Sequence, residues 1–266
     1  MIKNALRNLA DKFGYDFVKT DNFNFGKHTK RKSDHIGLDY FETSNGNYYL
    51  PKNLKGDGVA NRIKEGQVFD QNIIDIASSY FKKGTTLLDV GANYGQMSIV
   101  LSKMTDASSS IYAFEAQEMV FNILFKNLAK NNVTNVKPFF NAVYDQHNID
   151  LIFPEPDLVR FPTYGSYGID PNAKTGKAVK SLTIDSLNFE NPVSFMKVDI
   201  QGSDLFALKG AVNTIAQYQM PIIFEYEEQF QEEFHTSFQD YVDFVNSIGY
   251  KFLKTVDSIN YLIVPK

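Results

Sequence analysis

The chain has 266 residues, a net charge of −4 and 43% hydrophobic residues, which is enough apolar sequence for one large core. The acidic balance argues against a nucleic-acid partner, whose binding site would be basic. The absence of cysteine excludes disulfides, thiolate metal sites and thiol nucleophiles. We find neither a signal-peptide core nor a run of about 18 apolar residues, and therefore expect a cytoplasmic protein without stable membrane insertion.

Residues 1–65 are predicted to form an N-terminal extension. Apolar residues recur every three or four positions over residues 1–18, which is typical of an amphipathic helix packed on the domain or on a second subunit. The basic patch at residues 27–32 is interpreted as a solvated loop, or as a grip on an anionic part of the substrate. A hairpin is expected from three segments: Tyr40–Thr43, the turn Asn45–Asn47, and Tyr48–Leu50. The extension is compatible with substrate contacts and with a homodimer.

From residue 66 onward, strands alternate with helices, which predicts right-handed βαβ units and a parallel sheet. The expected strands are 87–90, 110–114, 136–140, 193–198 and 221–225. The first expected helix is capped by Asp70 and runs to Phe81, and the second has the apolar face Met97, Val100, Leu101 and Met104. Three more are expected: one through Leu128, one over Leu205–Ile215, and one that ends before Gly249.

Two segments depart from this alternation. Residues 145–192 hold only short strands around a loop rich in Pro, Gly, Tyr and Ser, and are interpreted as an insertion that contacts substrate. The last strands, 250–255 and 260–264, are separated by so few residues that they must pair antiparallel. We therefore expect residues 66–266 to form an α/β domain with a Rossmann-like, doubly wound, mainly parallel sheet and an antiparallel C-terminal hairpin.

The glycine turn after the first of these strands is the most informative feature. Asn93 and Gln96 stand where a dinucleotide fingerprint requires glycine. Asp89, just before the turn, suits a ligand that carries an ammonium group. Glu115 ends the next strand, where it can accept both hydroxyls of a ribose, and Asn141 ends the third, where it reads adenine or forms an Asx turn. S-Adenosylmethionine has these three parts and no phosphate.

Several segments resemble motifs of the FkbM family of methyltransferases. They are Asp89–Gly95, Phe114–Ala116, Leu182–Leu187, Lys197–Gly202 and Leu208–Ala211. The resemblance covers about residues 66–226 and implies a class I methyltransferase that uses S-adenosylmethionine, releases S-adenosylhomocysteine and O-methylates sugars or natural products. Together with the glycine turn, it implies a cofactor site formed by Asp89, Gly91, Asn93, Gly95, Glu115 and Asn141.

The sequence departs from the family pattern at two positions. Gln201 stands where the K-x-D-x-E-G motif of the family carries its glutamate, which removes one negative charge beside the predicted crevice. Ala116 replaces the proline of an E-P pair, a change that we interpret as minor. The charge lost at Gln201 motivates an alternative function, a non-catalytic subunit that binds S-adenosylmethionine.

The candidate catalytic residues end the strands that follow the insertion, since ligands of doubly wound sheets lie outside the carboxyl ends of the strands. Asp199 is the first candidate for the base or substrate orienter, with helix capping as its alternative role. Glu225 is the second, with solvent exposure as the alternative. Lys197 shares a face with Asp199 and is expected to pair with it or to orient substrate. Asp199 with Glu225 provides oxygen ligands for Mg²⁺, but no Asp-Asp pair or His cluster accompanies them, so a metal is not favoured.

The insertion supplies the candidate substrate-binding residues Tyr164, Ser166 and Tyr167, which lie among glycines. This composition suits a mobile wall whose aromatic rings stack on a sugar, or simply an irregular surface loop. The leading prediction is an O-methyltransferase acting on a sugar hydroxyl in a glycan or nucleotide-sugar. The alternative acceptor is a hydroxyl of a lipid or secondary metabolite.

Overall fold

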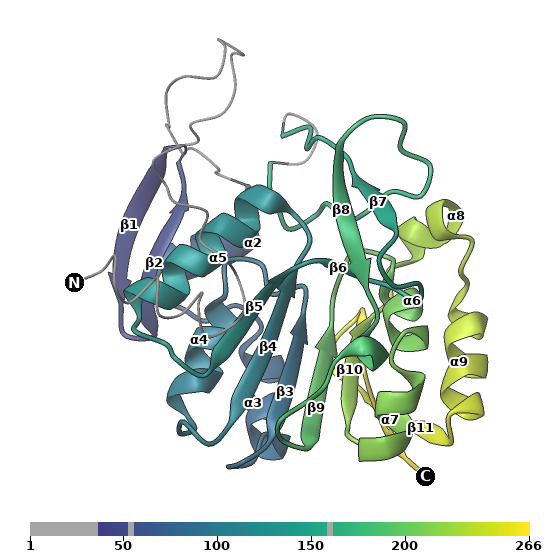
Figure 1. The fold of residues 1–266 in the computed structure, drawn as a ribbon. Coiled ribbons are helices and arrows are strands. Elements are labelled where there is room, and N and C mark those ends of the chain that lie inside the picture. Colours follow the sequence, from purple (N-terminus) through teal and green to yellow (C-terminus); the bar gives the residue numbers. More distant parts are fainter. Residues whose placement is uncertain (1–36, 53–55, 159–161) are drawn as a thin grey trace.

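A seven-stranded sheet forms the centre of the protein (Figure 1). The structure, a computed structural model, describes residues 37–52, 56–158 and 162–266. The helix expected over residues 1–18 and the basic patch at 27–32 lie outside these ranges. None of the helices in the described ranges combines the length and apolar character needed to cross a bilayer.

The strand order of the central sheet is β11-β12-β10-β9-β3-β4-β5. Its five parallel strands are β3 (Thr86–Val90), β4 (Ser110–Glu115), β5 (Val136–Phe140), β9 (Val193–Val198) and β10 (Ile222–Glu225). The antiparallel edge consists of β12 (Asn260–Pro265) and β11 (Tyr250–Thr255). The Rossmann-like, mainly parallel sheet with an antiparallel C-terminal hairpin is therefore confirmed.

Helices cover both faces of this sheet, which creates two apolar cores. One face carries α3 (Gln71–Tyr80), α4 (Gln96–Lys103) and α5 (Glu118–Lys130). The other carries α6 (Asp204–Lys209), α7 (Val212–Tyr218) and α9 (Phe238–Ser247). Leu87 and Leu88 enter opposite cores, because successive side chains of a strand point to opposite faces. Burial on both faces explains why the parallel strands read as continuous apolar runs.

The N-terminal hairpin packs beside α5 (Figure 1) and shares its core. Its strands are β1 (Leu38–Thr43) and β2 (Gly46–Pro51), and α2 (Gly58–Lys64) follows them. The hairpin was expected, but with its turn at Asn45–Asn47. Because Thr43 pairs with Gly46, the turn consists of the two residues Ser44 and Asn45. The sequence pattern did not predict α2.

The fully buried side chain of Asn127 joins this hairpin to the rest of the fold. Its Oδ1 accepts a hydrogen bond from the backbone N–H of Tyr49 (2.7 Å). Its amide nitrogen donates to the carbonyl oxygens of Tyr49 (3.2 Å) and Tyr94 (2.9 Å). One side chain of α5 therefore satisfies backbone groups of both β2 and the glycine turn.

The insertion folds into a small sheet of its own. Its strands β7 (Asp150–Phe153) and β8 (Lys177–Leu182) pair with β6 (Ala142–Val143), which lies just before the insertion, and a 3₁₀ turn over Ile184–Ser186 follows β8. β7 pairs antiparallel with β8, and β6 pairs parallel with it. After β10, a second 3₁₀ turn, Glu228–Phe230, leads into the short helix α8 (Gln231–Phe234).

Three local expectations about the helices were wrong. The single helix expected over Leu205–Ile215 is broken into α6 and α7 at Gly210, where a Cβ would lie 2.1 Å from the carbonyl oxygen of Tyr144. Asp70 precedes α3 in a left-handed conformation (φ 51°), and its side chain makes no capping bond. Met104, expected on the apolar face of α4, follows the last residue of that helix and is 59% exposed. The buried positions of α4 are Gln96, Ser98, Ile99, Leu101 and Ser102.

Asn127→Ala should lower the free energy of unfolding by about 2–4 kcal/mol, because the change leaves buried backbone groups without partners. Urea denaturation followed by circular dichroism measures this loss. Asn131→Ala is the matched control: Asn131 makes similar bonds to Asn47, but it is only half-buried, so water can replace the amide. Equal losses in the two variants would contradict the role given to Asn127.

Candidate active site

The turn between β3 and α4 uses three left-handed residues, Gly91 (φ 83°), Asn93 (φ 50°) and Gly95 (φ 85°). The backbone N–H groups of Gly91 and Ala92 both donate to the carbonyl oxygen of Phe114 on β4 (3.0 and 2.9 Å). A Cβ at position 91 would lie 1.9 Å from the carbonyl oxygen of Asp199. Position 91 therefore requires glycine both for its φ and for the close approach of the loop after β9.

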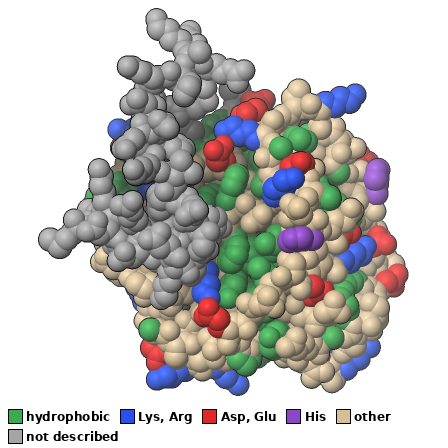
Figure 2. Space-filling view, in the orientation of Figure 1, with side chains coloured by type: hydrophobic (Ala, Val, Ile, Leu, Met, Phe, Trp, Pro, Cys, Tyr) green, Lys and Arg blue, Asp and Glu red, His purple; other side chains and the backbone are tan. Residues whose placement is uncertain are grey.

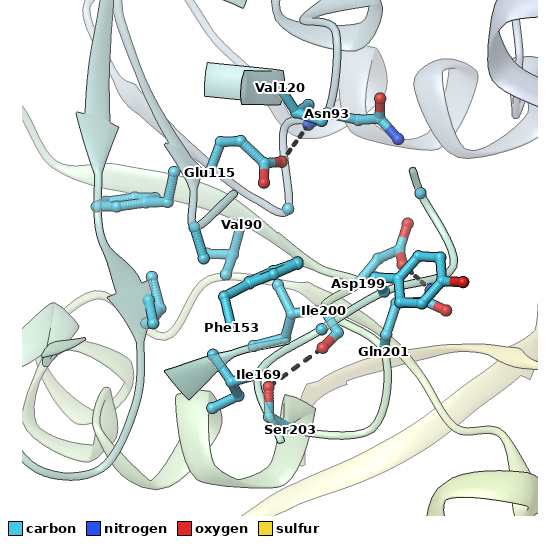
Figure 3. Close-up of a pocket in the computed structure, with 18 of the residues that line it drawn as sticks. Val90, Asn93, Glu115, Val120, Phe153, Ile169, Asp199, Ile200, Gln201 and Ser203 are labelled. Atoms are coloured by element: carbon cyan, nitrogen blue, oxygen red, sulfur yellow. Dashed lines mark hydrogen bonds between the residues drawn. The ribbon is translucent and has the colours of Figure 1, made fainter. Parts of the chain in front are cut away.

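Glu115, at the end of β4, holds the same turn from the other side (Figure 3). Its Oε2 accepts from the N–H of Asn93 (3.0 Å) and its Oε1 from the N–H of Gln117 (2.8 Å). Burial raises the pKa of the Glu115 carboxyl to about 7, although these hydrogen bonds act to lower it. The carboxylate thus fixes the turn and is poised between its two protonation states near neutral pH.

A cavity lies at the carboxyl ends of β3, β4 and β9 and encloses about 630 Å³, the space at its open mouth included. The sequence-predicted site residues that line it are Gly91, Asn93, Glu115, Asn141, Tyr164, Tyr167 and Asp199. Those that lie outside the lining are Asp89, Gly95, Ser166, Lys197 and Glu225. The structure therefore brings together at least one residue from each predicted group: the catalytic, the cofactor-binding and the substrate-binding residues.

Apolar side chains that sequence reasoning missed form much of this cavity. Phe153 from β7 and Ile169 from the insertion project into it with Val120 of α5 (Figure 3). The alternation of side chains in β7 contained a signal for Phe153, the only fully buried position of that strand. The surface that Phe153 faces across the cavity comes from other segments of the chain, so only the fold shows it.

Asp89 is fully buried beneath the turn, where it has partners from the protein itself. Its Oδ2 accepts a hydrogen bond from Ser98 Oγ (2.6 Å), and its Oδ1 lies 3.9 Å from Lys197 Nζ. Burial raises the pKa of Asp89, whereas Lys197 acts to lower it. The ammonium group expected beside Asp89 is therefore supplied by Lys197, and a direct contact of Asp89 with a ligand stays a prediction.

Lys197 joins three groups with one buried ammonium. Its Nζ donates to the carbonyl oxygen of Gly91 (2.8 Å) and pairs with Asp199 Oδ2 (3.2 Å), in addition to facing Asp89. Burial alone would lower the pKa of Lys197, but Asp199 and Asp89 together raise it. Lys197 is therefore charged, and it connects the loop after β9 to the glycine turn.

Asp199 and Glu225 meet through the side chain of Gln201. The amide nitrogen of Gln201 lies 3.2 Å from Asp199 Oδ1 and 3.1 Å from Glu225 Oε2. Burial, followed by the charge of Asp199, raises the pKa of Glu225 to about 11. Burial also acts to raise the pKa of Asp199, but Lys197 and hydrogen bonds from its neighbours outweigh it and lower that pKa. Asp199 is therefore the ionised member of the pair.

Asp204 is a buried acid of this region that sequence reasoning missed. Its Oδ1 accepts from the N–H of Glu225 (3.4 Å), and its Oδ2 has no partner among the described residues. Burial, and then the charge of Asp199, raises the pKa of Asp204 to about 7. The N-cap position of α6 is Ser203, not Asp199, and the Ser203 side chain makes no capping bond. Across the described ranges, no group of three or more His, Asp, Glu or Cys side chains is arranged to hold a metal ion.

The insertion packs closely against the glycine turn and the loop after β9. A Cβ at Gly165 would lie 2.8 Å from the amide nitrogen of Asn93, and one at Gly168 would lie 3.0 Å from the carbonyl oxygen of Ile200. Tyr164 is only 6% exposed, and the hydroxyl of Tyr167 donates to the carbonyl of Asp157 (2.6 Å). The glycines of this segment thus let its backbone approach both loops.

Comparison with known families identifies one match in this chain. Residues 89–252 match the model of the methyltransferase FkbM domain. No curated protein sequence matches the chain significantly.

Three solved structures of similar fold share little sequence with the chain. An FkbM methyltransferase from Methylobacillus flagellatus KT is 17% identical (TM-score 0.46), with 68% of this chain and 44% of that one covered. A candidate methyltransferase from Streptococcus mutans, solved with SAH, is 13% identical (TM-score 0.44; 73% and 94% covered). A SAM-dependent O-methyltransferase from Thermotoga maritima is 13% identical (TM-score 0.44; 86% and 77% covered). This chain thus spans less than half of the Methylobacillus protein.

Gly91→Ala should destabilise the protein by more than Gly84→Ala. Both glycines have a left-handed φ, at 83° and 72°, but a Cβ at Gly84 meets nothing within 4 Å. Gly84→Ala should therefore cost only the backbone term of about 1–2 kcal/mol, whereas Gly91→Ala must also displace the backbone of Asp199. Urea unfolding of both variants measures the difference, and identical losses would show that the loop after β9 yields freely.

Proposed function

The chain belongs to the FkbM family of methyltransferases, and we propose that it transfers a methyl group from S-adenosylmethionine to a hydroxyl of a sugar, in a glycan or nucleotide-sugar. The observation that carries the proposal is the convergence of Asn93, Glu115 and Asp199 from three neighbouring strand ends on one cavity. In doubly wound sheets this edge is where ligands bind.

The donor set of the cavity fits S-adenosylmethionine, which supplies an electrophilic methyl carbon attached to a sulfonium. The turn of Gly91 and Asn93 leaves room for a ligand against its backbone. The Glu115 carboxylate has lone pairs beyond its two backbone bonds and accepts the ribose hydroxyls. Asn141 and the apolar wall of Phe153 and Val120 receive the adenine.

Asp199 orients the acceptor hydroxyl and takes its proton. Asp199 is 27% exposed in its side chain, and lines the cavity. Its lowered pKa makes it a weak base at rest, but an alcohol oxygen becomes strongly acidic as it is methylated, so a weak base is sufficient. Much of the rate then comes from alignment of the reacting atoms and from exclusion of water by the insertion.

A neutral, polyhydroxylated acceptor suits the wall that faces Asp199. Tyr164 and Tyr167 line the cavity with aromatic rings from the insertion, and Ser166 lies between them in the sequence. The carboxylates of Glu115 and Asp199 repel phosphate groups, which disfavours nucleic acid and requires the diphosphate of a nucleotide-sugar to lie away from them. On the face drawn in Figure 2, acidic and basic side chains of the described surface are interspersed. The same contacts would accept a hydroxyl of a lipid or secondary metabolite, so the acceptor screen below includes both.

The protein should bind S-adenosylhomocysteine with an affinity that falls as the pH drops below about 7. Below this pH, protonation of Glu115 removes acceptor lone pairs, and ribose hydroxyls favour the ionised form. Glu115→Gln should weaken binding by roughly tenfold to a hundredfold and flatten the pH dependence. Isothermal titration calorimetry between pH 5.5 and 8.5 measures both effects. Absence of binding at every pH would refute the cofactor assignment.

Asp199→Asn should leave S-adenosylhomocysteine affinity within a few-fold of wild type but lower methyl transfer by about 10²–10⁴-fold. The amide keeps the shape of the carboxylate and cannot take a proton. Transfer is measured with radiolabelled S-adenosylmethionine on a panel of glycans, nucleotide-sugars, lipids and glycosides. Asp243→Asn, on the exposed face of α9, is the control. Full activity of Asp199→Asn would remove the proposed role of Asp199.

A further inference from the structure

The side-chain amide of Gln201 lies between two carboxyl groups. Its nitrogen is within hydrogen-bond distance of Asp199 Oδ1 (3.2 Å) and Glu225 Oε2 (3.1 Å), and Figure 3 shows the bond to Asp199. An amide nitrogen has two N–H donors, one for each oxygen. The opposite orientation would place the amide oxygen against two acceptors, so the hydrogen bonds fix which way the amide points.

The backbone is strained at this residue. Gln201 has a left-handed φ of 55°, and Gly202 follows with a φ of 92°. The left-handed conformation costs a residue with a Cβ about 1–2 kcal/mol. A Cβ at Gly202 would lie 2.5 Å from the side chain of Phe230, so α8 and its preceding turn hold this loop in place. Strain that the surroundings maintain is typical of functional sites.

Acidic side chains surround Gln201. Four further acids act on the pKa of Asp199, of Glu225 or of their neighbours. Among the described residues, Lys197 is the one cation that acts on the same group of acids. These acids are Asp89, Asp70, Asp204 and Glu227. Mg²⁺ and Mn²⁺ bind carboxylate oxygens, so Asp199 and Glu225 would offer two such ligands if the amide of Gln201 did not lie between them.

We propose that the Gln201 amide takes the place of a divalent cation between Asp199 and Glu225, and that Gln201 is a positioning residue that keeps this corner metal-free. A cation would occupy the lone pairs of Asp199 and prevent it from accepting a proton. The neutral amide donates to both carboxyls and leaves Asp199 able to act as the base. This inference rests on the role given to Asp199 in the proposed function.

Two substitutions test the inference through Mn²⁺ binding to the full chain, followed by electron paramagnetic resonance. Gln201→Glu places a third carboxylate at the position and should bind Mn²⁺ roughly tenfold or more tightly than wild type. Gln201→Ala vacates the position without adding charge and should bind more tightly than wild type but less tightly than Gln201→Glu. In EDTA, Gln201→Glu should melt at a lower temperature than wild type, and MnCl₂ should reverse the loss.

The double variant Gln201→Glu/Glu225→Gln is the matched control, since it exchanges the amide and the carboxyl. It should recover the melting temperature in EDTA and return to the wild-type Mn²⁺ affinity, which a purely structural role of Gln201 would not predict. Wild type that binds Mn²⁺ as tightly as Gln201→Ala would overturn the inference, even if Gln201→Glu failed to fold. Calorimetry with S-adenosylhomocysteine is run in parallel: its failure in wild type refutes the proposed function, whereas the Mn²⁺ comparison tests only Gln201.

Discussion

The active-site region depends on one buried cation, the ammonium of Lys197. β3 and β9 are neighbours in the sheet, and Asp89 lies directly opposite Lys197 in their register. Two acids, Asp89 and Asp199, are therefore forced together at the ends of adjacent strands. Without Lys197, their repulsion and desolvation would oppose the approach of the two loops. Removal of one partner from such a buried group usually costs about 3–5 kcal/mol, so the glycine turn and the loop after β9 hold their shape as one unit.

Neutral side-chain amides also join separate segments of the chain. Asn127 fastens the hairpin to the glycine turn. Gln96 accepts from the N–H of Phe69 (2.9 Å) and donates to the carbonyl of Gln67 (2.9 Å), which fixes the chain before α3. Gln201 joins Asp199 to Glu225. An amide both donates and accepts, so it satisfies buried polar groups without introducing a charge that would itself need a partner.

The sequence was sufficient to predict the sheet and the strand ends at which the candidate residues lie, because both follow from local patterns. Apolar runs that end in polar residues placed Glu115 and Asp199 at the same edge, and glycines marked the turn between them. It was not sufficient to predict what these residues contact. Asp89 was expected to face a ligand, but its partner Lys197 lies more than 100 positions away in the chain. The break at Gly210 and the bridge made by Gln201 likewise depend on segments that only the folded chain brings together.

The insertion wall forms a separate three-stranded sheet with β6 rather than extending the central one. Its glycines contact the cofactor-side loops through backbone and small groups, at Asn93 and at Ile200. A wall attached in this way is modular: its strands and its tyrosines can diverge while Lys197 and the glycine turn stay constant. Residues 145–192, the proposed acceptor wall, could therefore be exchanged for those of a relative without rebuilding the glycine turn and the loop after β9.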